Sequence, residues 1–411
     1  MKINRYILPN GLRLVHHEDT STQMVALNIV YNVGARDEHP DHTGFAHLFE
    51  HLMFGGSAHI PDYDIPLQQA GGENNAWTNN DITNYYLTVP RANVETGFWL
   101  ESDRMLGLAF SDHNLEVQRG VVMEEFKQRC LNQPYGDVGH LIRPLAYKTH
   151  PYRWPTIGKQ LSHIADATLE EVETFFYRYY APNNAILAVT GNISWQQAKT
   201  LTEKWFGDIP RRKVPVRRLP QEPEQDGERR LAVERQVPVD ALFMAWRMCG
   251  RNEADYYAFD ILSDILCNGR SSRLTQSLVR ERKLFSNIDA YIDGSQDPGL
   301  LHVGGKLSTG VSMETAEAAV WEELDKLIQT PVTDWELDKV KNKFESTQIF
   351  GNINYLNVAT NLAYFELIGQ AEDIDTEVSR YRAVTPEHLQ EVARRTLRHE
   401  NTSVLEYRRK A

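Results

Sequence analysis

A five-residue stretch, His47-Leu48-Phe49-Glu50-His51, restricts what this chain can fold into more than any other feature of its sequence. Its two imidazoles and its carboxylate stand at positions i, i+3 and i+4, which share one face of an α-helix because the helix turns every ~3.6 residues. Two histidines so placed can hold one zinc ion, and the glutamate can reach a water molecule at that ion. The stretch therefore predicts a helix with His47 and His51 as zinc ligands and Glu50 as a base.

The residues around this stretch predict that the helix is buried. Thr43 is a candidate helix cap, and Gly55-Gly56 end the segment. Leu48, Leu52 and Met53 supply an apolar face. Polar groups on such a helix need partners, because unpaired polar groups cost free energy inside a protein. A metal ion would be such a partner.

Composition limits the class of protein. A chain of 411 residues predicts two or more domains, and 41% hydrophobic with 24% charged residues is typical of a globular protein. No apolar run approaches the roughly 20 residues of a membrane helix, so no membrane partner is expected. The net charge of −12 argues against nucleic acid as a partner.

The termini and cysteines predict the compartment. The N-terminus shows no signal-peptide pattern. The three cysteines, Cys130, Cys249 and Cys267, form no C-x-x-C pair and indicate a reducing environment. A cytoplasmic location is expected, with a periplasmic one as the alternative if the chain is a processed form.

The second half of the chain repeats the pattern of the first. A strand pattern at 24–31 precedes the metal motif, and another at 242–248 precedes a helical pattern at 255–266. Asp260 then stands where His47 stands, so the second copy lacks the imidazoles; two unrelated amphipathic helices are the alternative. The predicted domains are a zinc-bearing domain over 1–210, a Pro-rich and charged connector over 211–230, and a pseudo-repeat without metal over 231–411.

Catalytic zinc sites usually have three protein ligands, so a third ligand is needed. The candidates are Glu116, Glu124 and Glu125, all in one helical stretch. Glu125 follows Val121 by four residues and Val122 by three, which places it beside an apolar face. Spacing alone does not choose among the three glutamates.

These features together resemble the M16 peptidases, the inverzincin family that includes pitrilysin, insulin-degrading enzyme and mitochondrial processing peptidase. The resemblance covers nearly the whole chain. Its motifs are Gly34-Ala35-Arg36, Gly44-Phe45-Ala46-His47, Glu50-His51, Phe54-Gly55-Gly56, Gly71 to Thr78, Gly120 to Glu125, His150-Pro151-Tyr152 and Tyr180 to Asn184.

The resemblance implies an α+β fold of two homologous domains, each a mostly antiparallel mixed sheet packed against helices. It implies one Zn²⁺ per chain with Glu125 as third ligand, and a peptide substrate bound as an added edge strand beside Asn75 and Ala76. Its M16B type implies that two chains form a closed four-domain chamber in which Glu50 activates a zinc-bound water for endopeptidase cleavage.

Two departures from the family pattern concern the support of the zinc and the partner. Gln118 replaces the acidic residue that often precedes the ligand glutamate by seven positions, so the support of the zinc is expected to differ. Arg280 matches an arginine that completes the substrate site, but the tyrosine expected seven residues later is missing, and Tyr291 is the candidate for a displaced substitute. The chain therefore resembles the catalytic half of a two-component enzyme whose partner is a homologous chain without the zinc motif. A self-sufficient homodimer and a non-catalytic scaffold subunit are the alternatives.

Overall fold

The computed structural model describes residues 1–410, which form two compact units. The first unit comprises Met1–Lys127, Trp154–Leu219 and Ile349–Thr376, and the second comprises Gln128–Arg153, Pro220–Gln348 and the chain from Glu377. The units therefore differ from the continuous ranges 1–210 and 231–411 expected from the sequence. Each unit includes one stretch, 128–153 or 349–376, that belongs by sequence to the other half of the chain.

The first unit is built on a six-stranded sheet. Its strands, in spatial order, are β1 (Asn4–Ile7), β2 (Arg13–Glu18), β6 (Ala185–Gly191), β3 (Met24–Tyr31), β5 (Thr83–Pro90) and β4 (Glu73–Thr78). β2 and β6 pair in parallel, and the other neighbours are antiparallel. β4 ends the order, so one of its edges has no strand of this sheet beside it.

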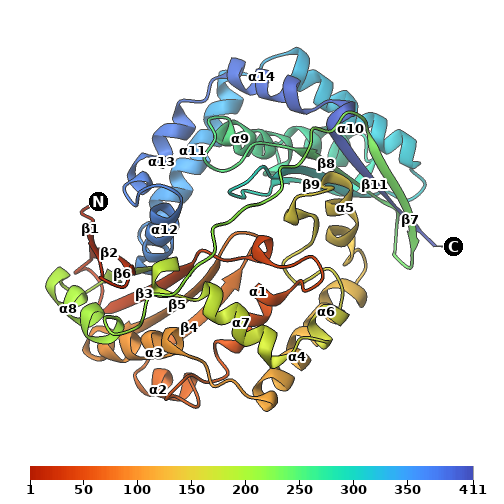
Figure 1. Cartoon of the computed structure of the whole chain (residues 1–411). Helices are drawn as coiled ribbons and strands as arrows, with labels where there is room; N and C mark the ends of the chain where they lie inside the picture. Colours follow the sequence, from red (N-terminus) through yellow and green to blue (C-terminus); the bar gives the residue numbers. More distant parts are fainter. Residues whose placement is uncertain (411) are drawn as a thin grey trace. The chain divides into compact units, whose positions relative to one another are not determined.

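Both faces of this sheet are buried, because alternate residues of its central strands are apolar on both sides. Leu27 and Ile29 of β3 join one core cluster with helices α1 (Phe45–Leu52), α3 (Val94–Leu106) and α8 (Trp195–Phe206). Ala26 and Val30, which alternate with them, pack in a second cluster with helix α12 (Tyr355–Ile368). Figure 1 shows α12 alongside β3 and β6, and α12 also contacts β2. The stretch 349–376 thus completes the core of the first unit.

Further helices of the first unit extend from this core. They are α2 (Asp64–Gln69), α4 (Asp112–Phe126), α6 (Ser162–Ala165) and α7 (Leu169–Tyr179), with short turns η1 (Ala35–Asp37), η2 (Arg91–Asn93) and η5 (Pro182–Asn184). Helix α1 contacts α4, α7, β4 and β5. It is therefore held between the sheet edge and two helices.

The second unit is built on a five-stranded sheet. Its strands, in spatial order, are β7 (Arg229–Arg235), β11 (Thr402–Arg409), β8 (Ala241–Arg247), β10 (Leu300–Leu307) and β9 (Phe285–Ile292). Helices α9 (Tyr256–Cys267), α10 (Met313–Gln329) and α14 (Pro386–Thr396) share a core with one face. Helix α5 (Val138–Ala146) packs on β7, β8 and β11. The remaining elements are α11 (Asp334–Gly351), α13 (Asp373–Arg382), η3 (Lys127–Leu131), η4 (Pro151–Arg153), η6 (Thr275–Glu281) and η7 (His399–Asn401).

The two sheets share one topology, which confirms the predicted pseudo-repeat and the α+β class. Strands β2, β6, β3, β5 and β4 correspond to β7, β11, β8, β10 and β9 in spatial order and in chain order, including the one parallel pair. Helix α9 follows β8 as α1 follows β3. Each sheet receives its second covering helix, α5 or α12, from the opposite half of the chain, and this exchange explains why the units are discontinuous.

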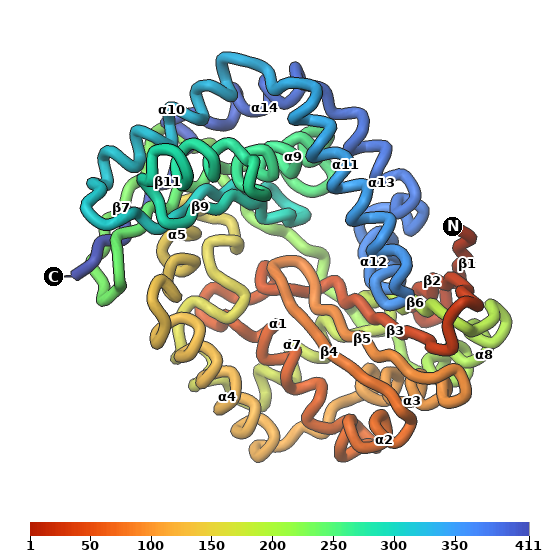
Figure 2. The backbone as a smooth tube through the Cα atoms, turned by 180° about the vertical axis from the view of Figure 1, so that it is seen from behind, coloured from red at the N-terminus to blue at the C-terminus, as the bar shows by residue number. Residues whose placement is uncertain are grey.

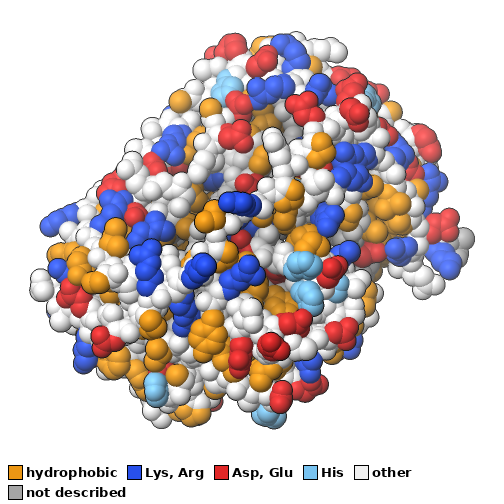
Figure 3. All heavy atoms as spheres, in the orientation of Figure 1, with side chains coloured by type: hydrophobic (Ala, Val, Ile, Leu, Met, Phe, Trp, Pro, Cys, Tyr) orange, Lys and Arg blue, Asp and Glu red, His pale blue; other side chains and the backbone are white. Residues whose placement is uncertain are grey.

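Charges are mixed on the surface. Figure 3 shows Lys and Arg side chains among Asp and Glu side chains across the visible face. Although the chain carries a net charge of −12, that face is not uniformly acidic. Within residues 1–410, no helix has the combination of length and apolar character that crossing a membrane requires.

Candidate metal centre

Helix α1 carries the two histidines and the glutamate of the motif. Its apolar residues, including Leu48, Phe49 and Leu52, are buried in the core of the first unit. The rings of His47 and His51 lie edge to face, with centroids 5.0 Å apart. One ligand atom from each of His47, Glu50 and His51 lies within 4.8 Å of the others. The predicted helix and the convergence of its three polar side chains are therefore both observed.

Helix α4 adds a carboxylate to this group. Glu125 Oε2 lies 3.4 Å from His47 Nε2 and 3.3 Å from His51 Nε2. The other candidates lie apart from it: Glu116 is 70% exposed and pairs with Arg119, and Glu124 is 55% exposed and pairs with Lys127. The structure thus brings Glu125, and neither of the other two glutamates, to the histidines.

The burial pattern of α4 corrects one step of the sequence argument. Val122 and Phe126 are buried, as expected, but Val121 is 46% exposed. The buried stripe of α4 is narrower than predicted, and of the two valines on the same face as Glu125 only Val122 belongs to it. Most other residues of α4 are polar, so the sequence of this helix shows only a weak apolar pattern.

The spacing of the three atoms fits a transition metal. Zinc binds imidazole nitrogen at about 2.0–2.1 Å and carboxylate oxygen at about 2.0–2.2 Å, so ligand atoms at two corners of a tetrahedron lie roughly 3.3–3.5 Å apart. The two measured separations, 3.4 and 3.3 Å, agree with that value. The side chains of His47, His51 and Glu125 are 9%, 24% and 18% exposed. The group is therefore mostly enclosed but still reached by solvent.

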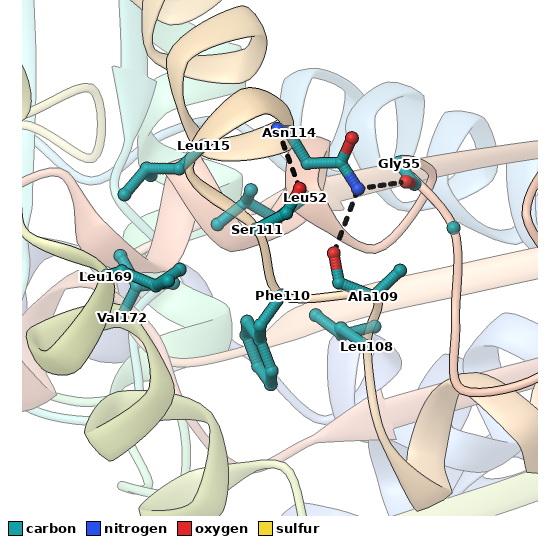
Figure 4. Close-up of a pocket in the computed structure, with 11 residues that line it drawn as sticks. Leu52, Gly55, Leu108, Ala109, Phe110, Ser111, Asn114, Leu115, Leu169 and Val172 are labelled. Carbon is teal, nitrogen blue, oxygen red and sulfur yellow. Dashed lines mark hydrogen bonds between the residues drawn. The ribbon is translucent and has the colours of Figure 1, made fainter.

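The start of α4 is tied to the end of α1. Figure 4 shows Asn114 between the loop after α1 and the loop before α4, beside a small cavity lined mainly by apolar residues. Its Nδ2 donates to the carbonyls of Gly55 and Ala109, at 3.0 and 2.9 Å. Ser111 caps α4 by accepting from the Asn114 amide. The two helices are therefore fixed to each other near Gly55 and meet again at Glu125.

The N-terminus of α1 is not capped by Thr43, so that expectation is wrong. The cap position is Gly44, with a φ of 90° and no side chain to accept a hydrogen bond. The Thr43 hydroxyl lies 2.8 Å from His163 Nδ1 and accepts from the Lys159 amide. Thr43 therefore holds the 159–163 loop rather than the helix.

A distant carboxylate takes the place of the cap. Glu38 accepts from the amides of Gly44 and Ala46, both at 2.9 Å, and from Trp154 Nε1 at 3.1 Å. Burial raises the pKa of Glu38 to about 8, and the three N–H donors oppose that rise. The sequence analysis placed Glu38 in a polar loop and assigned it no role, because no local signal links it to a helix six residues away.

A buried cation, Arg104, packs against the tyrosine that binds the backbone of α1. Arg104 pairs with Glu101, and its guanidinium lies 4.5 Å from the ring centroid of Tyr85. The Tyr85 hydroxyl donates to the carbonyl of Phe49 at 2.9 Å. Burial raises the pKa of Tyr85, and the nearby charge of Glu50 adds to this. Tyr85 therefore remains a protonated donor to the backbone of α1.

The predicted substrate residues lie on the free edge strand. Asn75 and Ala76 are in β4, opposite Tyr86 and Tyr85 of β5. The Ala76 amide donates to Asn75 Oδ1 at 2.8 Å. β4 also contacts α1, and Figure 2 shows β4 at the rim of the sheet with α1 beside it. The edge strand thus runs close to the helix that carries the histidines.

The residues predicted to complete the substrate site belong to the second unit. Arg280 is exposed in the turn η6. Tyr291 is in β9, 55% exposed, and its ring stacks on His302 with centroids 4.7 Å apart. Neither belongs to the group that α1 and α4 bring together, so their role stays a prediction.

Comparisons with known proteins agree with this geometry. Residues 13–151 match the family described as insulinase (peptidase family M16), and residues 166–344 match the M16 inactive domain. The zinc protease PqqE of Helicobacter pylori is 30% identical over 342 residues, which cover 81% of this chain and 76% of the relative.

Two solved structures share the fold. A protease from Helicobacter pylori has a TM-score of 0.94 at 27% identity, and the alignment covers 99% of each chain. The periplasmic protease PqqL of Escherichia coli has a TM-score of 0.80 at 21% identity. The alignment covers 99% of this chain but only 47% of PqqL, so this chain spans about half the length of that protein.

Proposed function

The chain belongs to the M16 peptidase family, and we propose that it is a zinc-dependent endopeptidase whose ion is held by His47, His51 and Glu125. The observation that carries this proposal is the single carboxylate oxygen of Glu125 at 3.4 and 3.3 Å from the two imidazole nitrogens. An ion pair needs only one histidine, whereas a shared ion accounts for all three side chains. The names of the relatives, which are zinc proteases, also support the metal.

Glu50 is the proposed general base. When bound, zinc lowers the pKa of water to about 7 and polarises a carbonyl group. Glu50 shares one face of α1 with both histidines but is not needed to complete a three-ligand set. Its carboxylate takes the proton of the attacking water and returns it to the leaving amine, so that both transfers use one side chain.

β4 is the proposed binding strand for the peptide. A free strand edge offers backbone groups that can pair with an extended chain. The Ala76 amide, which donates to the neighbouring Asn75 side chain, can donate instead to a substrate carbonyl. Recognition through the main chain makes little demand on substrate sequence and selects unfolded or extended peptides.

A second M16 chain is the proposed partner. The fold of this chain spans 47% of PqqL, which supports an enclosed chamber made from two such chains. Arg280 would take part in that chamber, with Tyr291 as the tyrosine nearest in sequence to the missing one. The partner is either a homologous chain without the zinc motif or a second copy of this chain.

Metal content and peptide cleavage test the function together. The purified protein is expected to contain about one zinc per chain and to cleave a quenched fluorescent peptide, and chelation should stop cleavage until zinc is restored. A metal-free protein that stays inactive after zinc addition, with or without its co-purifying partner, would instead support the scaffold alternative. Mass identification of proteins that co-purify with the chain decides between the two forms of the partner.

A further inference from the structure

Three consecutive residues before α1 each bind a different part of the first unit. The guanidinium of Arg36 pairs with Asp81 at 2.9 Å, in the turn between β4 and β5. Asp37 pairs with Arg217 of the connector at 2.7 Å. Glu38 binds the first turn of α1 and Trp154. The segment therefore links the edge strand, the connector and the helix of the metal centre.

Helix α1 has an unusual need for such a link. It is eight residues long, its cap residue is a glycine, and its first turn contains no acidic side chain. The first amides of any helix have no partner within the helix, and a buried amide left without one costs roughly 1–3 kcal/mol. Gly44 and Ala46 are both buried, so water is not a ready substitute for Glu38.

We propose that Glu38 is a positioning residue, which fixes the first turn of α1 so that His47, Glu50 and His51 face Glu125. This inference rests on the proposed zinc peptidase function. Ala46 directly precedes His47, so a shift of the first turn moves the first imidazole. Because α1 spans little more than two turns, the displacement would reach Glu50 and His51 as well.

The position requires two accepting atoms, since both oxygens of Glu38 accept hydrogen bonds. Oε1 takes the Ala46 amide, and Oε2 takes the Gly44 amide and Trp154 Nε1. A glutamine has the same shape but replaces one oxygen with an NH₂ group, which would oppose a donor. Glu38→Gln therefore removes one accepting atom while leaving the volume of the side chain unchanged.

Asp37 provides a matched control. It is adjacent to Glu38, and its carboxylate binds the Gly34 amide and Arg217, both outside α1. Asp37→Asn makes the same exchange of an accepting oxygen for an NH₂ group in the same loop. A general weakening of this loop would affect both variants, whereas a positioning role predicts an effect of E38Q alone on α1.

Hydrogen exchange and zinc affinity test the proposal. In the metal-free protein, E38Q is expected to raise the exchange rate of peptides covering 44–48 by about tenfold, and D37N is expected to leave it unchanged. With zinc restored, E38Q should weaken zinc binding by about tenfold in a chelator competition. It should also lower kcat while changing KM less than twofold, since β4 is not moved.

The outcomes separate this proposal from the function on which it rests. If the wild-type protein binds no zinc, the proposed function fails, and exchange still reports on Glu38. If the wild-type protein binds zinc and E38Q matches it in exchange and affinity, Glu38 is not a positioning residue. Should E38Q fail to fold, Glu38→Asp makes the same test, because its side chain is shorter by one methylene group. An exchange rate at residues 44–48 of this variant equal to that of the wild-type protein would overturn the proposal.

Discussion

Helices α1 and α9 occupy the same place in two sheets of the same topology, yet they use it differently. In the alignment of the two halves expected from the sequence, Asp260 and Asp264 of α9 stand where His47 and His51 stand in α1. The Tyr381 hydroxyl donates to Asp260 at 2.5 Å, and Lys343 donates to Asp264 at 3.1 Å. Burial raises the pKa of Asp260 to about 6.

The difference shows that one fold can carry polar residues on the same helix with different kinds of partner. Polar groups on a buried helix must be partnered, and the partner can be a proposed ion or other side chains. In the second unit α11 and α13 supply the partners, Lys343 and Tyr381, directly. In the first unit α4 supplies Glu125, a third acceptor beside two imidazoles, and leaves a place for a cation.

The largest expected effect is on kcat, and it distinguishes Glu50 of α1 from Ser263, the residue aligned with it in α9. Glu50→Gln should lower kcat by about 10³-fold, equivalent to about 4 kcal/mol, because it removes the proposed base. Zinc content should be unchanged, since Glu50 is not a proposed ligand. Ser263 holds the corresponding position in α9, and Ser263→Ala should retain activity. Loss of zinc in E50Q would contradict the assignment of its role.

Disruption of a buried ion pair in the second unit should lower the stability of the protein without changing its zinc affinity. Glu377 and Arg251 form a pair that is 9% and 7% exposed, beside the hydroxyl of Tyr257. Glu377→Ala should lower the free energy of unfolding by about 3 kcal/mol, measured by urea denaturation, because it removes the carboxylate that pairs with a buried cation. Zinc affinity should be unaffected. The exposed pair of Glu345 and Arg382 provides the control, and Glu345→Ala should cost less than about 1 kcal/mol.

Removal of the third ligand tests the metal centre itself. Glu125→Gln should weaken zinc binding at least about 100-fold, or about 2.8 kcal/mol, in a competition with a chromogenic chelator. Glu124→Gln changes the neighbouring residue of the same helix and should leave affinity unchanged, because that side chain is 55% exposed and paired with Lys127. Equal affinities of the two variants would exclude Glu125 as a ligand.

The smallest expected effect concerns acid stability. Burial lowers the pKa of His163 and of His16 below the usual value near 6.5. The unfolded chain then binds protons more readily, so this stability is complete above pH 6.5 and is lost as the pH falls through the lowered pKa values. His163→Asn should flatten the decrease of Tm between pH 7 and pH 5, whereas exposed His39→Asn should not. A His163→Asn variant whose Tm falls on acidification as steeply as the wild-type Tm would contradict this contribution of His163.

Much of the site could be predicted from local sequence because helical periodicity places residues at i, i+3 and i+4 together. His47, Glu50 and His51 needed no other information. Glu125 could be narrowed to a few glutamates, but its selection depended on how α4 packs against α1. Val121 shows the limit of that approach, since an apolar residue beside the buried stripe lies exposed. Glu38 had no sequence signal at all, because its partners are two backbone amides and the side chain of Trp154, which is distant in the sequence.

The sequence by itself determined the elements that depend on short-range pattern: the metal-motif helix, the alternating strands and the repeat of strand and helix in the second half. Only the tertiary structure decided which carboxylate meets the histidines, which residue caps α1, and that α5 and α12 each cover the sheet of the opposite half. The physical reason is that periodicity acts over a few residues of one segment. Ligand geometry and core completion depend instead on packing between segments far apart in the chain.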